Sequence, residues 1–163
     1  MAPESVTLNP TQTPMPRITT AIHVDAPPDR VYAVAREAER FPEFMPDVKS
    51  TRVEERSPDG RRLVVAWEAL IPEFKVTIKW VEEDHWDPQA RRCDFRLVRG
   101  DFKAYSGAWQ FFPEDGGTRF ESVLDYEIEI PLIGPLIRGL IARKMRENVE
   151  KLLRALKNRA EEG

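Results

Sequence analysis

The chain has 163 residues, which is close to the commonest length of one domain and enough to enclose one hydrophobic core. Charged residues make up 33% of the sequence, yet the net charge is −3, so no basic surplus predicts nucleic-acid binding. One cysteine, Cys93, and two histidines, His23 and His85, are a poor set of zinc ligands, and we expect no cofactor. The cysteine usage, with no secretory signal and no apolar stretch of about 20 residues, predicts a soluble, cytoplasmic protein.

Residues 1–16 contain four prolines and almost no large apolar side chain, so we expect a flexible tail followed by one domain over 17–160. From Arg17 onward, apolar and polar residues alternate as in a half-buried strand, which stops at Ala26-Pro27-Pro28. The next segment carries apolar residues at helical spacing: Val31, Tyr32, Val34 and Ala35. A strand followed by a short amphipathic helix therefore opens the domain.

The segment 40–46 holds three large apolar side chains and two prolines, Pro42 and Pro46, which favours a second short helical turn packed on the core. Six strand-like stretches follow, at 47–57, 62–71, 74–87, 91–99, 102–112 and 118–130. Short turn sequences rich in Gly, Pro, Asp and Ser separate these stretches. Consecutive strands with short connections predict an antiparallel meander.

After Pro131 the apolar period changes to three and four residues and persists to Leu156, which indicates one long amphipathic helix. From about Pro135 to Ala160 this helix would be roughly 39 Å long, at ~1.5 Å per residue, and could cross the whole sheet. We therefore predict an α+β fold of the helix-grip type. In this fold a curved seven-stranded antiparallel sheet, with two short helices, wraps around a long C-terminal helix over a cavity.

Strand parity indicates which side chains face the cavity. The apolar row on the last strand includes Tyr126, whose phenol needs a hydrogen-bond partner or a place in the cavity. Arg99 shares the parity of Phe95, although its position beside Gly100 also allows it to reach outward. We expect the ligand-contacting residues to be Phe44, Met45, Trp67, Trp80, Phe95, Leu97, Arg99, Trp109, Tyr126, Ile130, Ile133, Leu136, Ile137 and Leu140. The alternative is that these aromatic side chains simply fill a solid core.

The register of the strand at 102–112 is ambiguous in the sequence. A two-residue turn at Gly100-Asp101 would place Trp109 opposite Arg92, on the outer face. A bulge near Ser106-Gly107 would turn Trp109 and its aromatic neighbours inward, and we favour this arrangement because a row of exposed aromatic side chains is unusual.

Four segments carry a resemblance to a known superfamily: His23–Pro27 before Val31-Tyr32, Phe41–Pro46, Gly100–Lys103 with Trp109–Phe111, and Tyr126–Leu132. Over 17–160 the chain resembles the polyketide cyclase/dehydrase and lipid-transport superfamily with START-like (SRPBCC, Bet v 1-like) folds. It looks most like the coenzyme-Q-binding and ribosome-association-toxin branch. The resemblance implies a prenylated quinone, a lipid or a polyketide-like molecule as the ligand.

Three functions remain open from the sequence. The first is a carrier or chaperone that holds an apolar small molecule and opens between 41–46 and the deformable helix start at 131–137. The second is a cyclase or dehydrase that uses Tyr126 and Arg99, with Glu82 as a further inward candidate. The third is a protein- or membrane-interaction module with transient membrane contact, because the long helix carries the cluster Arg138, Arg143, Lys144 and Arg146.

Overall fold

The structure is a computed structural model that describes residues 16–128 and 135–162, with side chains on the last helix described from Arg138 onward. The helices and strands follow in the order β1 (Arg17–Val24), α1 (Pro28–Arg36), η1 (Ala38–Arg40), α2 (Phe41–Phe44), β2 (Val48–Arg56), β3 (Arg62–Ile71), η2 (Pro72–Phe74), β4 (Val76–Asp87), β5 (Arg92–Gly100), β6 (Phe102–Glu114), β7 (Gly117–Ile128) and α3 (Pro135–Glu161). The predicted tail lies outside the described residues apart from Pro16, as do residues 129–134.

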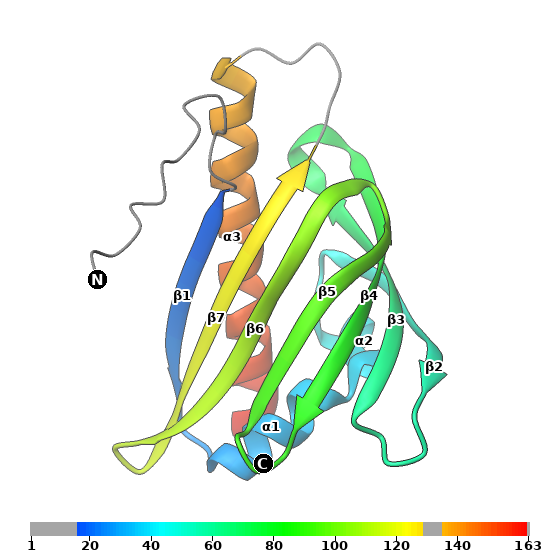
Figure 1. The fold of residues 1–163 in the computed structure, drawn as a ribbon. Coiled ribbons are helices and arrows are strands. Elements are labelled where there is room, and N and C mark those ends of the chain that lie inside the picture. Colours follow the sequence, from blue (N-terminus) through cyan, green and yellow to red (C-terminus); the bar gives the residue numbers. More distant parts are fainter. Residues whose placement is uncertain (1–15, 129–134, 163) are drawn as a thin grey trace, which may run out of the picture.

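The seven strands form one antiparallel sheet in the order β1-β7-β6-β5-β4-β3-β2. Figure 1 shows this sheet curving around α3, while α1 and α2 lie together at one end of it. The helix packs closely against β1 and α1, at one side of the sheet. The predicted helix-grip fold is therefore confirmed. Among the described helices, none is long and apolar enough to cross a membrane.

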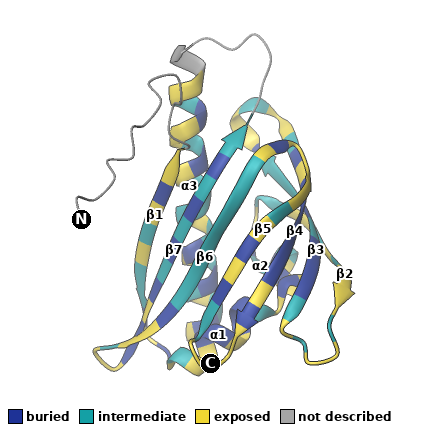
Figure 2. Cartoon of the chain, in the orientation of Figure 1, coloured by how far each residue is buried: buried dark blue, intermediate teal, exposed yellow. Residues whose placement is uncertain are grey.

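The end of the molecule near α1 is solidly packed. Phe111 on β6 and Phe120 on β7 stack with ring centroids 4.8 Å apart, and both are fully buried. Leu153 and Leu156 of α3 are buried in the same hydrophobic core. In Figure 2 the buried positions at this end of α3 and in α1 alternate with intermediate and exposed ones. These side chains fill the core at this end of the molecule.

The structure resolves the register of β6. Trp109 lies opposite Cys93, and Gln110 lies opposite Arg92, so Trp109 shares the inner face with Phe95. The predicted inward direction of Trp109 is therefore correct, but the predicted position of the irregularity is wrong. Pairing with β5 is regular from Ser106 onward, and the register of β6 against β7 shifts between Phe102 and Ala104. The shift therefore lies closer to the turn than predicted, and Gly100 before the turn pairs with Trp80 on β4.

Candidate functional site

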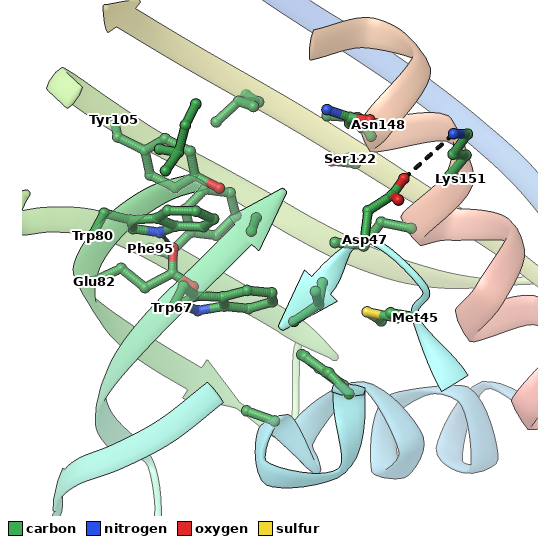
Figure 3. A pocket seen from close by; sticks show the side chains of 18 of the residues that line it. Met45, Asp47, Trp67, Trp80, Glu82, Phe95, Tyr105, Ser122, Asn148 and Lys151 are labelled. Carbon is green, nitrogen blue, oxygen red and sulfur yellow. Dashed lines mark hydrogen bonds and ion pairs between the residues drawn. The ribbon is translucent and has the colours of Figure 1, made fainter. Parts of the chain in front are cut away.

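A cavity of about 130 Å³ lies between the inner face of the sheet and α3 (Figure 3). Every strand except β1 contributes to its wall. The lining residues are Ala35, Ala38, Phe41, Met45, Pro46, Asp47, Val48, Trp67, Ala69, Leu70, Ile71, Ile78, Trp80, Glu82, Asp84, Trp86, Cys93, Phe95, Tyr105, Trp109, Ser122, Leu124, Met145, Asn148, Val149, Lys151 and Leu152. The wall is mostly apolar, with a few polar groups from β4, β7 and α3, which is the usual composition of a small-molecule site.

Aromatic rings form one side of the cavity. The indoles of Trp67 and Trp80 stack with centroids 5.4 Å apart and an interplanar angle of 9°. Tyr105 packs 5.5 Å from Trp80 and 5.5 Å from Phe95, measured between ring centroids. Phe95 lies over Gly107, where a Cβ atom would meet the phenyl ring at 2.6 Å. The missing side chain at Gly107 therefore makes room for this ring, and the wall presents flat aromatic surfaces to the cavity.

The strand β4 brings two carboxyl groups to this apolar wall. Alternation along the strand puts Ile78, Trp80, Glu82, Asp84 and Trp86 on the inner face. Glu82 is 5% exposed and Asp84 is 6% exposed. Glu83 lies between them in the sequence and points to the outer face, where Arg62 and Arg96 bind it. Three consecutive acids therefore have opposite surroundings, because successive strand residues face opposite sides of the sheet.

The two inner acids have strongly perturbed pKa values. Burial raises the pKa of Glu82 well above its ordinary value, and the nearby Asp84 raises it further. Burial raises the pKa of Asp84 to about 7, and a hydrogen bond from Glu82 acts in the opposite direction. On the outer face, hydrogen bonds from Arg62 and Arg96 lower the pKa of Glu83 to about 2. Burial and the neighbouring acid therefore favour the protonated form of Glu82, whereas Asp84 titrates near neutral pH.

Several buried polar atoms at the cavity lack a hydrogen-bond partner among the described residues. They include the indole nitrogens of Trp67 and Trp86 and the Oδ1 atom of Asp84. Figure 3 shows the Glu82 carboxyl group close to the indole nitrogens of Trp67 and Trp80. Trp80 donates to Glu82 Oε2 at 3.4 Å, whereas the Trp67 nitrogen makes no hydrogen bond of ordinary geometry. Buried groups of this kind usually have a partner, so the unpaired donors indicate a place for a ligand acceptor.

The cavity reaches the surface between the loop that follows α2 and the middle of α3. Pro46 and Lys151 are exposed members of its lining. Lys151 Nζ lies 3.3 Å from Asp47 Oδ2, so an ion pair joins the two sides of this opening (Figure 3). The predicted entrance used the same loop, but its other side, residues 131–137, lies outside the described side chains. The described opening is farther along α3.

The sequence model of the family described as polyketide cyclase / dehydrase and lipid transport matches residues 24–153. The chain belongs to this family. The predicted relationship is confirmed at this level, whereas no comparison tests the coenzyme-Q-binding branch. No curated protein matches the sequence.

Solved structures of similar proteins have the same fold. TTHA0849 from Thermus thermophilus shares 37% identity at a TM-score of 0.83, over 89% of this chain and 97% of that chain. The Zhui aromatase/cyclase from Streptomyces sp. R1128 shares 19% identity at a TM-score of 0.81, over 90% and 94% of the two chains. A START superfamily protein from Mycobacterium smegmatis shares 21% identity at a TM-score of 0.76, over 90% and 97%. The last two similarities show the fold alone.

Five of the predicted ligand-contacting residues of this chain line the cavity: Met45, Trp67, Trp80, Phe95 and Trp109. Five others lie elsewhere among the described residues, one of them Arg99 on the outer face. Phe44 packs on the core beneath Arg159, Leu97 is half-buried, Tyr126 is buried outside the lining, and Leu140 is half-buried on α3. Ile130 and Ile133 lie outside the described residues, and so do the side chains of Leu136 and Ile137.

The predicted inward direction of Arg99 is wrong. The register of β5 against β4 shifts, because Leu97 pairs with Glu82 while Arg99 pairs with Val81. The extra residue, Val98, turns Arg99 to the outer face, where its guanidinium binds Glu54 Oε2 at 3.0 Å. A catalytic pair of Tyr126 and Arg99 inside the cavity is therefore incompatible with this geometry.

Several lining residues were absent from the prediction, and Asp84 is the most important. Continuing the parity of Trp80 along its strand identifies Glu82, Asp84 and Trp86, so the signal was present in the sequence. Cys93 and Tyr105 could be placed at the cavity only from the register of β5 and β6, which the sequence left ambiguous. Met145, Val149 and Leu152 belong to the predicted apolar stripe of α3 and also line the cavity.

The basic cluster on α3 is partly neutralised. Lys144 lies 3.1 Å from Glu73 and 3.1 Å from Glu147. Arg138, Arg143 and Arg146 are exposed. Contact of this face with a membrane stays a prediction.

Proposed function

We propose that the chain binds an apolar small molecule with a ring carbonyl group in this cavity, and that it acts as a carrier or chaperone for that molecule. The observation that carries the proposal is the unpaired Trp67 indole N–H, buried in an aromatic wall next to the carboxyl group of Glu82, whose pKa burial raises well above its ordinary value. A carbonyl oxygen can accept both donors, while the flat rings of Trp67 and Trp80 supply dispersion contacts. A hydrocarbon would leave these donors without a partner.

The size of the cavity favours a ring. Its volume of about 130 Å³ is similar to that of an engineered cavity of ~150 Å³ that binds benzene. Burying ~200 Å² of ligand surface at ~25 cal/mol per Å² contributes about 5 kcal/mol before ordering costs. A prenylated quinone or a polyketide-like ring has the required carbonyl, and a longer tail would leave through the opening at Asp47 and Lys151. A simple acyl chain fits the donors less well.

The family supports a ligand of this class. The family is described by polyketide cyclisation, dehydration and lipid transport, and all three descriptions refer to largely apolar molecules. The Streptomyces protein with the same fold is named as an aromatase/cyclase. The specific ligand and the carrier role are our proposal.

A matched pair of ligands tests the proposal. Menadione has two ring carbonyls, and 2-methylnaphthalene has the same carbon skeleton without them. Binding of each is measured by protein-observed NMR to the wild type and to Trp67→Phe, which keeps an aromatic ring but loses the N–H donor. We expect menadione to bind more tightly than 2-methylnaphthalene to the wild type. Loss of one hydrogen bond of ~1 kcal/mol weakens menadione about fivefold in the variant and leaves 2-methylnaphthalene unchanged. Equal affinity of the two ligands for the wild type, or no binding of either, contradicts the proposal.

A further inference from the structure

The cavity contains more polar chemistry than binding alone requires. Glu82 and Asp84 are two residues apart on the same face of β4, which places their Cα atoms roughly 7 Å apart. Both side chains line the cavity, and Asp84 Oδ1 has no hydrogen-bond partner among the described residues. A single donor is enough to orient a carbonyl group, so the second acid has no role in simple binding.

Two buried acids are also costly for a fold that needs only a binding pocket. Among the described lining residues the one basic side chain is Lys151, and it pairs with Asp47 at the opening. Glu82 and Asp84 thus lack the cationic partners that Glu83 has on the outer face. Apolar residues at both positions would avoid the desolvation cost of the acids. Pairs of acids with different protonation states in apolar surroundings are typical of acid–base catalysis.

We infer that Glu82 and Asp84 act together as proton donor and proton acceptor on a bound apolar ketone, converting it to its enol. The inference rests on the proposed function, since the ketone oxygen must lie at the donors beside Trp67. The activity is proton transfer at the carbon next to the carbonyl group, and the substrates are enolisable ketones.

The step balances with no other reagent. The Asp84 carboxylate takes a proton from the carbon next to the carbonyl group, and the C–H electron pair forms a carbon–carbon double bond. The carbonyl π electrons move to the oxygen, which takes the proton of Glu82. The products are the enol, a neutral Asp84 and an ionised Glu82. Return of a proton to the ligand, or transfer between the neighbouring acids, restores the starting state.

The surroundings favour this division of roles. Trp80 donates a hydrogen bond to Glu82 Oε2 at 3.4 Å and can stabilise the charge that develops there. The other titratable groups that face the pair are Cys93 from β5 and Tyr105 from β6. Burial raises the pKa of both groups well above their ordinary values, so both stay neutral. Asp84 therefore has no competing base among the described groups that face the pair.

The test uses cyclohex-3-en-1-one, an unconjugated ketone with a single six-membered ring suited to the size of the cavity. Removal of a proton from its C2 atom and return to C4 gives cyclohex-2-en-1-one, whose conjugation is followed by ultraviolet absorbance. Binding of the same ketone is measured separately by saturation-transfer NMR. The variants are Glu82→Gln and Asp84→Asn, and the matched control is Glu83→Gln on the outer face of the same strand, with folding checked by circular dichroism.

We expect the wild type and Glu83→Gln to accelerate the isomerisation over buffer. Glu82→Gln and Asp84→Asn should each lose at least about 100-fold of that acceleration while still binding the ketone. Binding by the wild type without acceleration, or full activity in either cavity variant, overturns this inference and leaves the proposed function intact. Absence of ketone binding by the wild type overturns both.

Discussion

The pKa of Asp84 makes the stability of the fold depend on pH in a direction opposite to that of most acids. Its carboxyl group has an ordinary pKa of 3.8, and burial raises this value to about 7 in the folded state. Between these values the folded chain holds a proton that the unfolded chain has released. The free energy of unfolding therefore falls as the pH rises through this interval. At ~1.36 kcal/mol for each pH unit, the loss amounts to about 4 kcal/mol.

Asp84→Asn removes this titration and keeps the size of the side chain. Urea unfolding of the wild type and the variant is measured from pH 4 to pH 8, and the difference between the two free energies cancels the contribution of groups that do not interact with Asp84. We expect the variant to gain stability relative to the wild type as the pH rises, by up to about 4 kcal/mol, with no further gain above pH 8.

Glu83→Gln is the control for this measurement. The pKa of Glu83 is lowered to about 2, so its stabilising effect is complete above the ordinary value of 4.5 and is lost only as the pH falls toward 2. Its difference from the wild type should therefore be constant from pH 5.5 to pH 8. A constant difference for Asp84→Asn over the same interval would refute the assignment of Asp84 as a buried acid of raised pKa.

The remaining predictions concern packing and the edge of the sheet. Gly107→Ala should destabilise the fold by about 2 kcal/mol or more in urea unfolding, because its Cβ would meet Val123 O at 2.1 Å and the Phe95 ring at 2.6 Å. Gly139→Ala, with no atom within 4 Å of the added Cβ, should be neutral or stabilising, and an equal effect of both substitutions would contradict the packing argument. The pKa of His23 is raised by two carboxylate neighbours that bind its ring nitrogens at 2.9 and 3.0 Å. The stability of the wild type relative to His23→Gln should thus be greatest below pH 6.5 and fall as the pH rises through the folded-state pKa. A difference that grows with pH would exclude stabilisation of the fold by the protonated His23 ring.

Much of the aromatic wall could be predicted from local patterns. The alternation around Trp67 and Trp80 identified the inner face of β3 and β4, because side-chain direction in a regular strand depends only on parity. The same parity extends to Asp84, so that residue was predictable as well. Arg99 was not, because one additional residue in β5 reverses the face of every position beyond it.

The sequence by itself determined the order of the elements, the helix-grip fold and the inner faces of the regular strands, because these depend on local periodicity and turn residues. Only the tertiary structure decided the positions of the bulges, the size of the cavity and which polar groups share it. These properties depend on the pairing of distant strands and on where α3 packs against β1 and α1. The neighbouring acids Glu82 and Glu83 illustrate the difference, since the aromatic wall around one and the two arginines beside the other come from separate parts of the chain.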